Sequence, residues 1–174
     1  MKKFILTDET IEMFGVTLHR IKAVRSFGNV KEGDLGGFVE KEENISEHFE
    51  AWVYDNAKVW GNAKVLGNAK VWGDAEVYDN AEVWGDAEVW GNAKVCGNAK
   101  VWGNADYIVF KNWWSSGRYF TWTRSNNMWS VGCFYGTGEE LIKKAYADSE
   151  KSGREYERVV RFVESILEDE KNEK

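Results

Sequence analysis

A hydrophobic pattern repeats every six residues from Ala51 to Asn104, through nine consecutive units without an insertion. Each unit carries an alanine and, two positions later, a valine, followed by an apolar residue and a Gly or Asp next to an Asn or Asp. Side chains two residues apart point to the same side of an extended strand, so alanine and valine face inward together. Gly, Asn and Asp tolerate the positive φ of a tight corner. Each unit therefore predicts one short strand and one corner.

The period of six excludes an α-helix and favours a coil of strands. Apolar residues spaced by six drift around a helix of 3.6 residues per turn, and each interior glycine costs a helix about 1 kcal/mol relative to alanine. Three units close a triangular coil of eighteen residues, in which each strand pairs with its counterpart about 4.8 Å away in the next coil. We expect a mainly β fold, a parallel β-solenoid with three units per coil.

The charged residue between alanine and valine tests this coil independently. Its sign changes every eighteen residues, through the series Lys58, Lys64, Lys70, Glu76, Glu82, Glu88, Lys94, Lys100 and Asp106. Coils of eighteen residues would therefore place opposite charges on each other in three columns. Opposite charges across neighbouring strands stabilise a sheet by about 0.2–1 kcal/mol per pair, and a slipped register would bring like charges together.

The segments on either side of the repeat predict three domains. Residues 1–50 form an N-terminal β cap with strand-like runs at 4–6 and 16–24 and a glycine-rich start of an irregular first coil at 33–38. The solenoid follows at 51–105. Residues 106–174 form a small α+β module of order ββαα, with a hairpin turn at 125–127 and capping boxes that open helices at Thr137 and Ser152. Both flanking domains would cover strand edges that otherwise invite polymerisation.

Several of these motifs are similar to known families. An aliphatic residue followed four positions later by a small one, as in Val59 and Ala63, resembles the hexapeptide-repeat class, which implies a left-handed β-helix. Residues 1–105 resemble the YdcK-type β-solenoid proteins of bacterial genomes and prophages, through the runs 6–10, 18–23, 33–38 and 52–57. The run 131–140 resembles a C-terminal module of phage-borne proteins of Gram-positive bacteria. These resemblances imply a phage or prophage protein in the cytoplasm of a bacterial host.

Aromatic residues dominate the position that follows each valine, and the chain holds 10 Trp. Eighteen-residue stacking would order these positions into three outward ladders: Tyr54, Trp72 and Trp90; Trp60, Tyr78 and Cys96; Leu66, Trp84 and Trp102. Exposed aromatic rows are typical of interfaces, because they bury large rigid surfaces. We predict Trp60, Trp72, Trp84, Trp90 and Trp102 as a binding surface for a partner or for a homo-oligomer, either a dimer or a trimer. The alternative is that these rings only pack on each other and on lysine stems.

A second group of aromatic and basic residues follows the repeat. It comprises Lys111, Trp113, Trp114, Arg118, Trp122 and Arg124, and it could hold a small anionic planar ligand such as a nucleotide signal. The alternative is that the aromatic rings form the core of the C-terminal module, with the cations outside.

Catalytic chemistry is scarce in this sequence. The chain has 2 His, His19 and His48, and neither lies in the repeat. An acyltransferase with His48 as base and coenzyme A as donor is the enzyme alternative, whereas the γ-type carbonic anhydrases on this fold need three metal-binding histidines. We expect no cofactor, no metal and no membrane segment. The net charge of −6 disfavours nucleic acid as the partner.

The function we expect is therefore binding without catalysis. The hypothesis is that the chain binds and inhibits or sequesters a protein of the bacterial host, with antiphage defence as one target class. The acyltransferase and a sponge for nucleotide signals remain the two alternatives.

Overall fold

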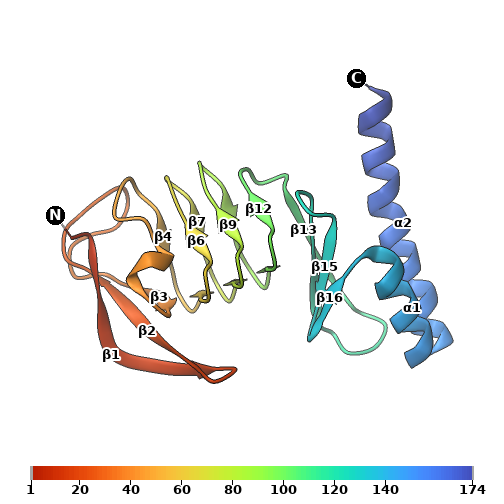
Figure 1. The fold of residues 1–174 in the computed structure, drawn as a ribbon, viewed down its shortest axis with the longest axis horizontal. Coiled ribbons are helices and arrows are strands. Elements are labelled where there is room, and N and C mark those ends of the chain that lie inside the picture. Colours follow the sequence, from red (N-terminus) through yellow and green to blue (C-terminus); the bar gives the residue numbers. More distant parts are fainter. Residues whose placement is uncertain (1, 174) are drawn as a thin grey trace.

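Short parallel strands stacked into a solenoid form the centre of the molecule in the computed structural model, which describes residues 2–173 (Figure 1). The chain begins with β1 (Phe4–Met13), β2 (Val16–Ala23), β3 (Leu35–Val39) and a short 3₁₀ helix at Glu42–Asn44. Nine two-residue strands follow: β4 (Trp52–Val53), β5 (Lys58–Val59), β6 (Lys64–Val65), β7 (Lys70–Val71), β8 (Glu76–Val77), β9 (Glu82–Val83), β10 (Glu88–Val89), β11 (Lys94–Val95) and β12 (Lys100–Val101). The predicted mainly β solenoid is confirmed.

From β4 onward, successive coils pair residues that are eighteen positions apart. The strands form three parallel stacks, β4-β7-β10, β6-β9-β12 and β3-β5-β8-β11. Lys58 lies beside Glu76, and Glu76 lies beside Lys94. The predicted three units per coil are therefore present, and so is the alternation of charge along the stack.

From Ala57 onward, the small apolar residues of the repeat fill the interior of the solenoid. Every valine and alanine of the units from Ala57 to Val101 is fully buried. The polar backbone is satisfied between coils, as where Trp60 N donates to Val77 O at 3.1 Å. At one corner Gly61 has φ 69°, and Asp79 occupies the same place one coil later with φ 60°. Chain geometry and hydrogen bonding thus repeat together from coil to coil.

The first coil lies within the segment predicted as the cap. β3 pairs in parallel with β5, and Ile45 forms a bridge with Val65, so this coil is offset from the next by twenty residues at both places. The backbones approach closely here, because a Cβ at Gly37 would lie 2.4 Å from the carbonyl oxygen of Ala57. Residues 35–53 therefore form the irregular first coil, and the hairpin before it forms the cap.

A buried lysine closes the N-terminal end of the stack. Lys3 Nζ donates to the carbonyl oxygens of Ser46 at 2.5 Å and Ala51 at 2.8 Å, and it lies 4.9 Å from the centroid of the Phe27 ring. Burial lowers the pKa of Lys3 to about 8. The ammonium group thus satisfies backbone acceptors that have no further coil to bond them.

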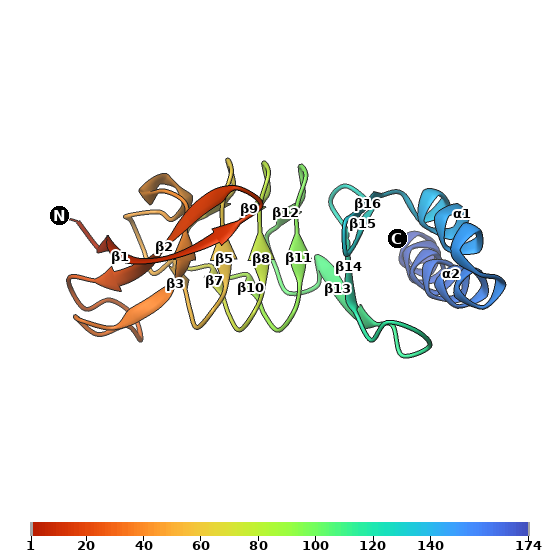
Figure 2. The same cartoon turned by 90° about the horizontal axis from the view of Figure 1, so that it is seen from below.

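The hairpin of β1 and β2 continues one sheet of the solenoid and then runs along its side. β2 pairs antiparallel with β3, which gives the order β1-β2-β3-β5-β8-β11. Seen from below, the hairpin lies across the face that carries β5 and β8 (Figure 2). One of the three solenoid faces is therefore partly covered by the chain itself.

The C-terminal module is a four-stranded antiparallel sheet followed by two helices. Its elements are β13 (Tyr107–Lys111), β14 (Tyr119–Thr123), β15 (Met128–Val131), β16 (Phe134–Gly136), α1 (Gly138–Asp148) and α2 (Glu150–Asn172). The predicted capping box at Thr137 is present. The second helix begins before Ser152, because Ser149 Oγ accepts a hydrogen bond from Ser152 N at 3.1 Å and caps it. The strands β13 to β16 make four, rather than the two of the expected ββαα order.

The two faces of this sheet have different partners. On β14, Phe120 and Trp122 belong to the core shared with the helices. On the other face, Thr121 Oγ1 accepts a hydrogen bond from Lys94 N at 2.9 Å. Beyond the end of β14, Ser125 Oγ accepts one from Lys100 N at 2.7 Å. The module thus covers the last coil and bonds the edge groups that no further coil would bond.

The third charge column stops one step earlier than the sequence predicts. Lys70 lies beside Glu88, but Asp106 turns back, and its carboxylate accepts hydrogen bonds from Trp102 N at 2.8 Å and Gly103 N at 3.0 Å. The chain leaves the solenoid here, so Asp106 acts as a cap of the last corner. Within residues 2–173, no helix is long and apolar enough to cross a membrane.

The charge column gives a stability prediction. Glu76 Oε2 and Lys94 Nζ are 2.7 Å apart and partly buried, and Lys58 flanks Glu76 on its other side. Glu76→Lys places three lysines in one column and should lower the free energy of unfolding by about 1–2 kcal/mol. Urea unfolding followed by circular dichroism measures this change.

The reversed column is the control for Glu76→Lys. Combining Glu76→Lys with Lys58→Glu and Lys94→Glu restores alternating signs and should recover most of the lost stability. If the triple variant is no more stable than Glu76→Lys, the charges do not set the register.

Candidate functional site

The aromatic side chains form ladders with the predicted eighteen-residue spacing. Tyr54 and Trp72 are stacked, with ring centroids 3.8 Å apart and an interplanar angle of 5°. Trp60 and Tyr78 are stacked at 4.5 Å and 4°. Trp84 and Trp102 meet edge to face at 4.7 Å and 68°. Each ladder follows from coil stacking, because equivalent positions lie directly above one another.

The ladder of Trp60, Tyr78 and Cys96 is covered by the molecule itself. Trp60 is 7% exposed and clusters with Leu18 and Phe38, while Ile11, Met13 and Val16 of the hairpin pack around this cluster. Trp60, predicted to project outward into a binding surface, is instead buried, because the hairpin folds back over it. This is a correction to the expected site.

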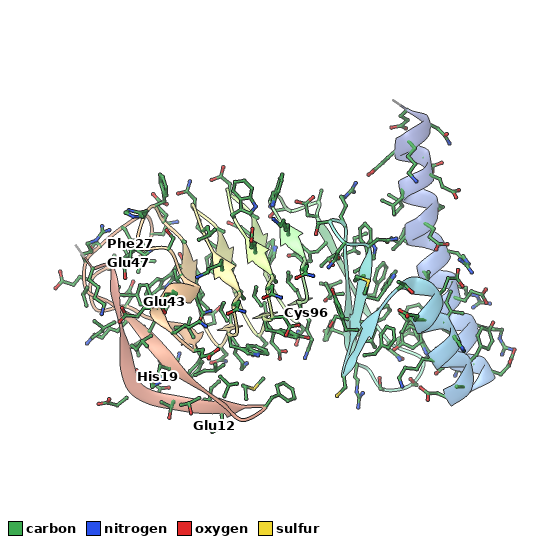
Figure 3. All side chains as sticks on the ribbon, viewed as in Figure 1. Glu12, His19, Phe27, Glu43, Glu47 and Cys96 are labelled. Atoms are coloured by element: carbon green, nitrogen blue, oxygen red, sulfur yellow. The ribbon has the colours of Figure 1, made fainter. Side chains whose placement is uncertain are left out.

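The far end of the covered ladder reaches the C-terminal module. Cys96 is 2% exposed and lies where the last coil meets the module (Figure 3). Burial raises the pKa of the Cys96 thiol. The pKa of the Tyr78 hydroxyl is also raised, first by burial and then by the neighbouring Cys96. Both groups therefore stay protonated at neutral pH, as expected of core residues.

The other two ladders end in open tryptophans. Trp90 is 59% exposed, Trp102 is 56% exposed and Trp84 is 40% exposed. They belong to two different stacks, since Trp90 follows β10 whereas Trp84 and Trp102 follow β9 and β12. The hairpin does not cover these stacks, so the predicted binding residues Trp72, Trp84, Trp90 and Trp102 lie on two open faces.

Acidic groups surround the ladder of Tyr54, Trp72 and Trp90. An open hollow of about 350 Å³ lies beside the outer rings; it is lined by Asp55, Trp72, Gly73, Glu88, Trp90 and Gly91. The pKa of Tyr54 is raised by burial and further by the carboxylates of Glu50, Glu88 and Asp34. This face therefore combines aromatic surface with negative charge.

Basic groups accompany the outer end of the other open ladder. A hollow of about 320 Å³ is lined by Lys100, Trp102, Asp106, Arg124 and Ser125. Arg124 is bound to Glu170 by two hydrogen bonds of 2.6 and 3.0 Å, which raise the pKa of its guanidinium further. The two open ladders therefore present tryptophans in different electrostatic settings.

The predicted aromatic and basic cluster of the module is not one site. Trp122 is buried between sheet and helices, where its Nε1 donates to Asn127 Oδ1 at 2.8 Å. Trp114 is buried against Tyr156 at 4.9 Å and 86°, which agrees with the core alternative. Trp113 is 71% exposed, and Lys111 Nζ lies 5.4 Å from the centroid of the Tyr119 ring. Arg118 and Arg124 flank opposite ends of β14, so they do not share a ligand.

Arg118 instead lines a hollow that the sequence analysis did not identify. This space of about 260 Å³ is lined by Asn112, Ser115, Ser116, Arg118, Val131, Phe134, Leu141, Lys144, Ala145, Asp148, Ser152 and Tyr156. Two cations, the carboxylate of Asp148 and several hydroxyl groups line this space together with apolar side chains. Asn112 Nδ2 donates to Tyr156 Oη at 3.1 Å. Lys144 could not be predicted from the sequence, because α1 and residues 112–118 line the same hollow only in the folded module.

The histidines and cysteines do not form a recognisable catalytic group. His19 is on the hairpin, where its Nδ1 lies 3.2 Å from the carbonyl oxygen of Thr7 (Figure 3). His48 is exposed in the first coil, and its backbone N donates to Ser46 Oγ. Among residues 2–173, no group of three or more His, Cys, Asp or Glu side chains is placed to hold a metal ion.

Comparison with known proteins gives no family or function for this chain, so a functional site has to be inferred from its surfaces. No protein-family model matches the chain, and no curated protein matches it at a significant level. The YdcK-type likeness and the phage-type module remain predictions from the sequence. The open ladders are the strongest candidate site, because they expose large aromatic area that a folded monomer does not need.

The covered ladder yields a prediction about stability. Leu18 is fully buried against Trp60 and Phe38, so Leu18→Ala should lower the free energy of unfolding by about 2–5 kcal/mol through lost packing and a residual cavity. Leu35→Ala is the matched control, because Leu35 is exposed and should cost less than about 0.5 kcal/mol. Urea unfolding measures both. Equal losses for the two variants would show that the hairpin does not pack on the ladder.

Proposed function

We propose that this chain is a non-catalytic binding protein that contacts a protein partner through its two open aromatic ladders. The observation that carries the proposal is the contrast among the three ladders of the molecule. One ladder is covered by apolar side chains of the chain's own hairpin, whereas the ladders that end in Trp90 and Trp102 are open. The covered ladder supports the view that such a ladder is a surface on which a β-rich element docks.

The energetics of tryptophan support the same function. A tryptophan buries roughly 150–250 Å² on binding and is enriched among the few residues that carry most interface energy. Trp84 and Trp102 are held in place by their edge-to-face contact and by the rigid coils beneath them. Such preorganised rings lose little conformational freedom when a partner covers them.

The partner in this proposal is a protein of a bacterial host, which the chain inhibits or sequesters. The support is the likeness of the run 131–140 to phage-borne modules and of residues 1–105 to YdcK-type proteins, together with the scarcity of catalytic residues. A target in antiphage defence fits that origin. A homo-oligomer, dimer or trimer, is the competing use of the same ladders.

The acyltransferase alternative has less support. It relies on His48 as the base, and His48 is exposed on a loop of the first coil, outside the residues that line the hollows at the ladders and in the module. A base that serves coenzyme A chemistry needs a neighbouring site that positions the thioester. The ladders do not provide this, so binding remains the better proposal.

The proposed function is tested by capture from bacterial lysate with matched tryptophan variants. The tagged protein should retain a defined host protein, identified by mass spectrometry, and this should be lost with Trp84→Ser/Trp102→Ser or with Trp72→Ser/Trp90→Ser. Trp113→Ser is the control, because Trp113 is 71% exposed but lies outside the ladders. Circular dichroism verifies that each variant is folded.

The outcome of this capture distinguishes the competing uses of the ladders. Recovery of the protein alone, as an oligomer that both ladder variants disrupt, would replace the host partner by self-association. Capture that is equal in all variants would contradict a role for either ladder.

A second candidate function, retention of a small anionic ligand, is favoured by the hollow of about 260 Å³ in the module. Arg118 and Lys144 supply positive charge, and Phe134 and Leu141 supply apolar surface for the remainder of such a ligand. The carboxylate of Asp148 also lines the hollow, so the two cations leave one net positive charge there for an anion. The nucleotide-signal sponge would thus use Arg118 with Lys144 instead of Trp122 and Arg124.

Mass spectrometry of the denatured protein tests this second function. An anion released from the purified wild type should be lost from Arg118→Ser/Lys144→Ser and kept by Arg154→Ser, whose exposed arginine lies outside the hollow. A wild type that releases no anion, or an anion kept by the double variant, would end the sponge proposal.

A further inference from the structure

The hollow beside Trp72 and Trp90 differs from the rest of the ladders in its combination of groups. Trp72 stacks on Tyr54 at 3.8 Å, and Trp72 and Trp90 both line the hollow. Asp55 and Glu88 complete the lining together with Gly73 and Gly91. Two tryptophans and two carboxylates therefore line the same space.

The charges around this hollow are predominantly negative. Asp55 Oδ2 accepts a hydrogen bond from Gly73 N at 3.1 Å, which fixes one carboxylate at the corner of the coil. Glu88 Oε1 lies 3.8 Å from Lys70 Nζ, a loose contact that leaves the carboxylate able to accept further donors. Glu50 and Asp34 add negative charge near Tyr54, at the inner end of the ladder.

Aromatic faces bordered by carboxylates are suited to one class of ligand. The face of an indole ring attracts a cation, and Trp is the best of the aromatic side chains for this contact. Among cations, a guanidinium is planar and weakly hydrated, so it can stack on an indole ring while its N–H groups donate to carboxylates. The hollow at Trp102 differs, because two cations, Lys100 and Arg124, line it beside the single carboxylate of Asp106.

We propose that the hollow lined by Trp72 and Trp90 binds an arginine side chain on an extended segment of the protein partner. The guanidinium lies against the indole rings and donates to Glu88 and Asp55. This inference rests on the proposed function and assigns the chemistry that the partner presents to one of the two open ladders.

A short synthetic peptide tests the inference without the partner. The probe is a fluorescein-labelled peptide Gly-Ser-Arg-Gly-Arg-Ser-Gly, and fluorescence anisotropy at low ionic strength measures its binding, because salt screens exposed charges. The same peptide with citrulline at both arginines keeps the shape and removes the charge. We expect the wild-type protein to bind the arginine peptide and to bind the citrulline peptide at least tenfold more weakly.

Matched variants locate the binding to the hollow. Trp90→Ser and Glu88→Gln should each weaken binding of the arginine peptide by roughly tenfold, through loss of a cation–π contact or of a charged acceptor. Trp113→Ser and Glu168→Gln are the controls, because they make the same changes outside the ladders, at an exposed tryptophan of the module and on α2, and they should leave binding unchanged. Thermal unfolding verifies that all four variants are folded.

Several results would overturn the inference. The first is failure of the arginine peptide to bind, and the second is equal binding of the citrulline peptide. The third is an equal loss of binding in the control variants, which would indicate attraction to the net charge of −6 alone. These results would leave the proposed function intact if lysate capture still depended on Trp84 and Trp102. If capture depended on neither ladder while the peptide bound at Trp90, the proposed function would fail and the arginine site would stand.

Discussion

Backbone hydrogen bonds between residues of neighbouring coils hold the solenoid together, as between Trp60 N and Val77 O. They fix an eighteen-residue register that stacks each position of the six-residue unit on its counterpart. The buried alanines and valines, the alternating charges and the aromatic ladders all follow from that register. The corner asparagines follow too, since Asn62 Nδ2 donates to Asn80 Oδ1 at 3.1 Å. A slip of one coil would place like charges together along the stack.

The same register leaves strand edges exposed at the two ends of the stack, and the segments that cover these ends determine which ladders stay open. A stack of coils exposes unbonded strand edges at both ends. Lys3 and the hairpin close one end, and the sheet of the C-terminal module closes the other. The hairpin also lies along one face and buries Trp60 there, while the remaining faces keep exposed Trp90 and Trp102. The proposed binding surface is thus what the covers leave open.

Features that depend on local periodicity could be predicted, whereas features that depend on distant contacts could not. Strand positions, coil size and the pairing of Lys58 with Glu76 follow from repeat spacing alone. The burial of Trp60 depends on the hairpin folding back over it, and no spacing within the repeat encodes that contact. Likewise, Trp122 belongs to the module core and Arg124 to an ion pair with Glu170. These roles depend on which face of β14 meets the last coil. For this reason the residues of the predicted cluster around Arg118 lie in different parts of the module.

The measurement that tests the central claim most directly is oxidative footprinting of the tryptophans, with the modified residues identified by mass spectrometry. Every ladder tryptophan occupies the same position of its unit, so differences in modification report what covers each ladder. We expect rapid modification of Trp90 and Trp102, slower modification of Trp84, and protection of Trp60 comparable to that of the buried Trp52. Modification of Trp60 as fast as that of Trp90 would contradict the covered ladder, and with it the argument for the two open ones.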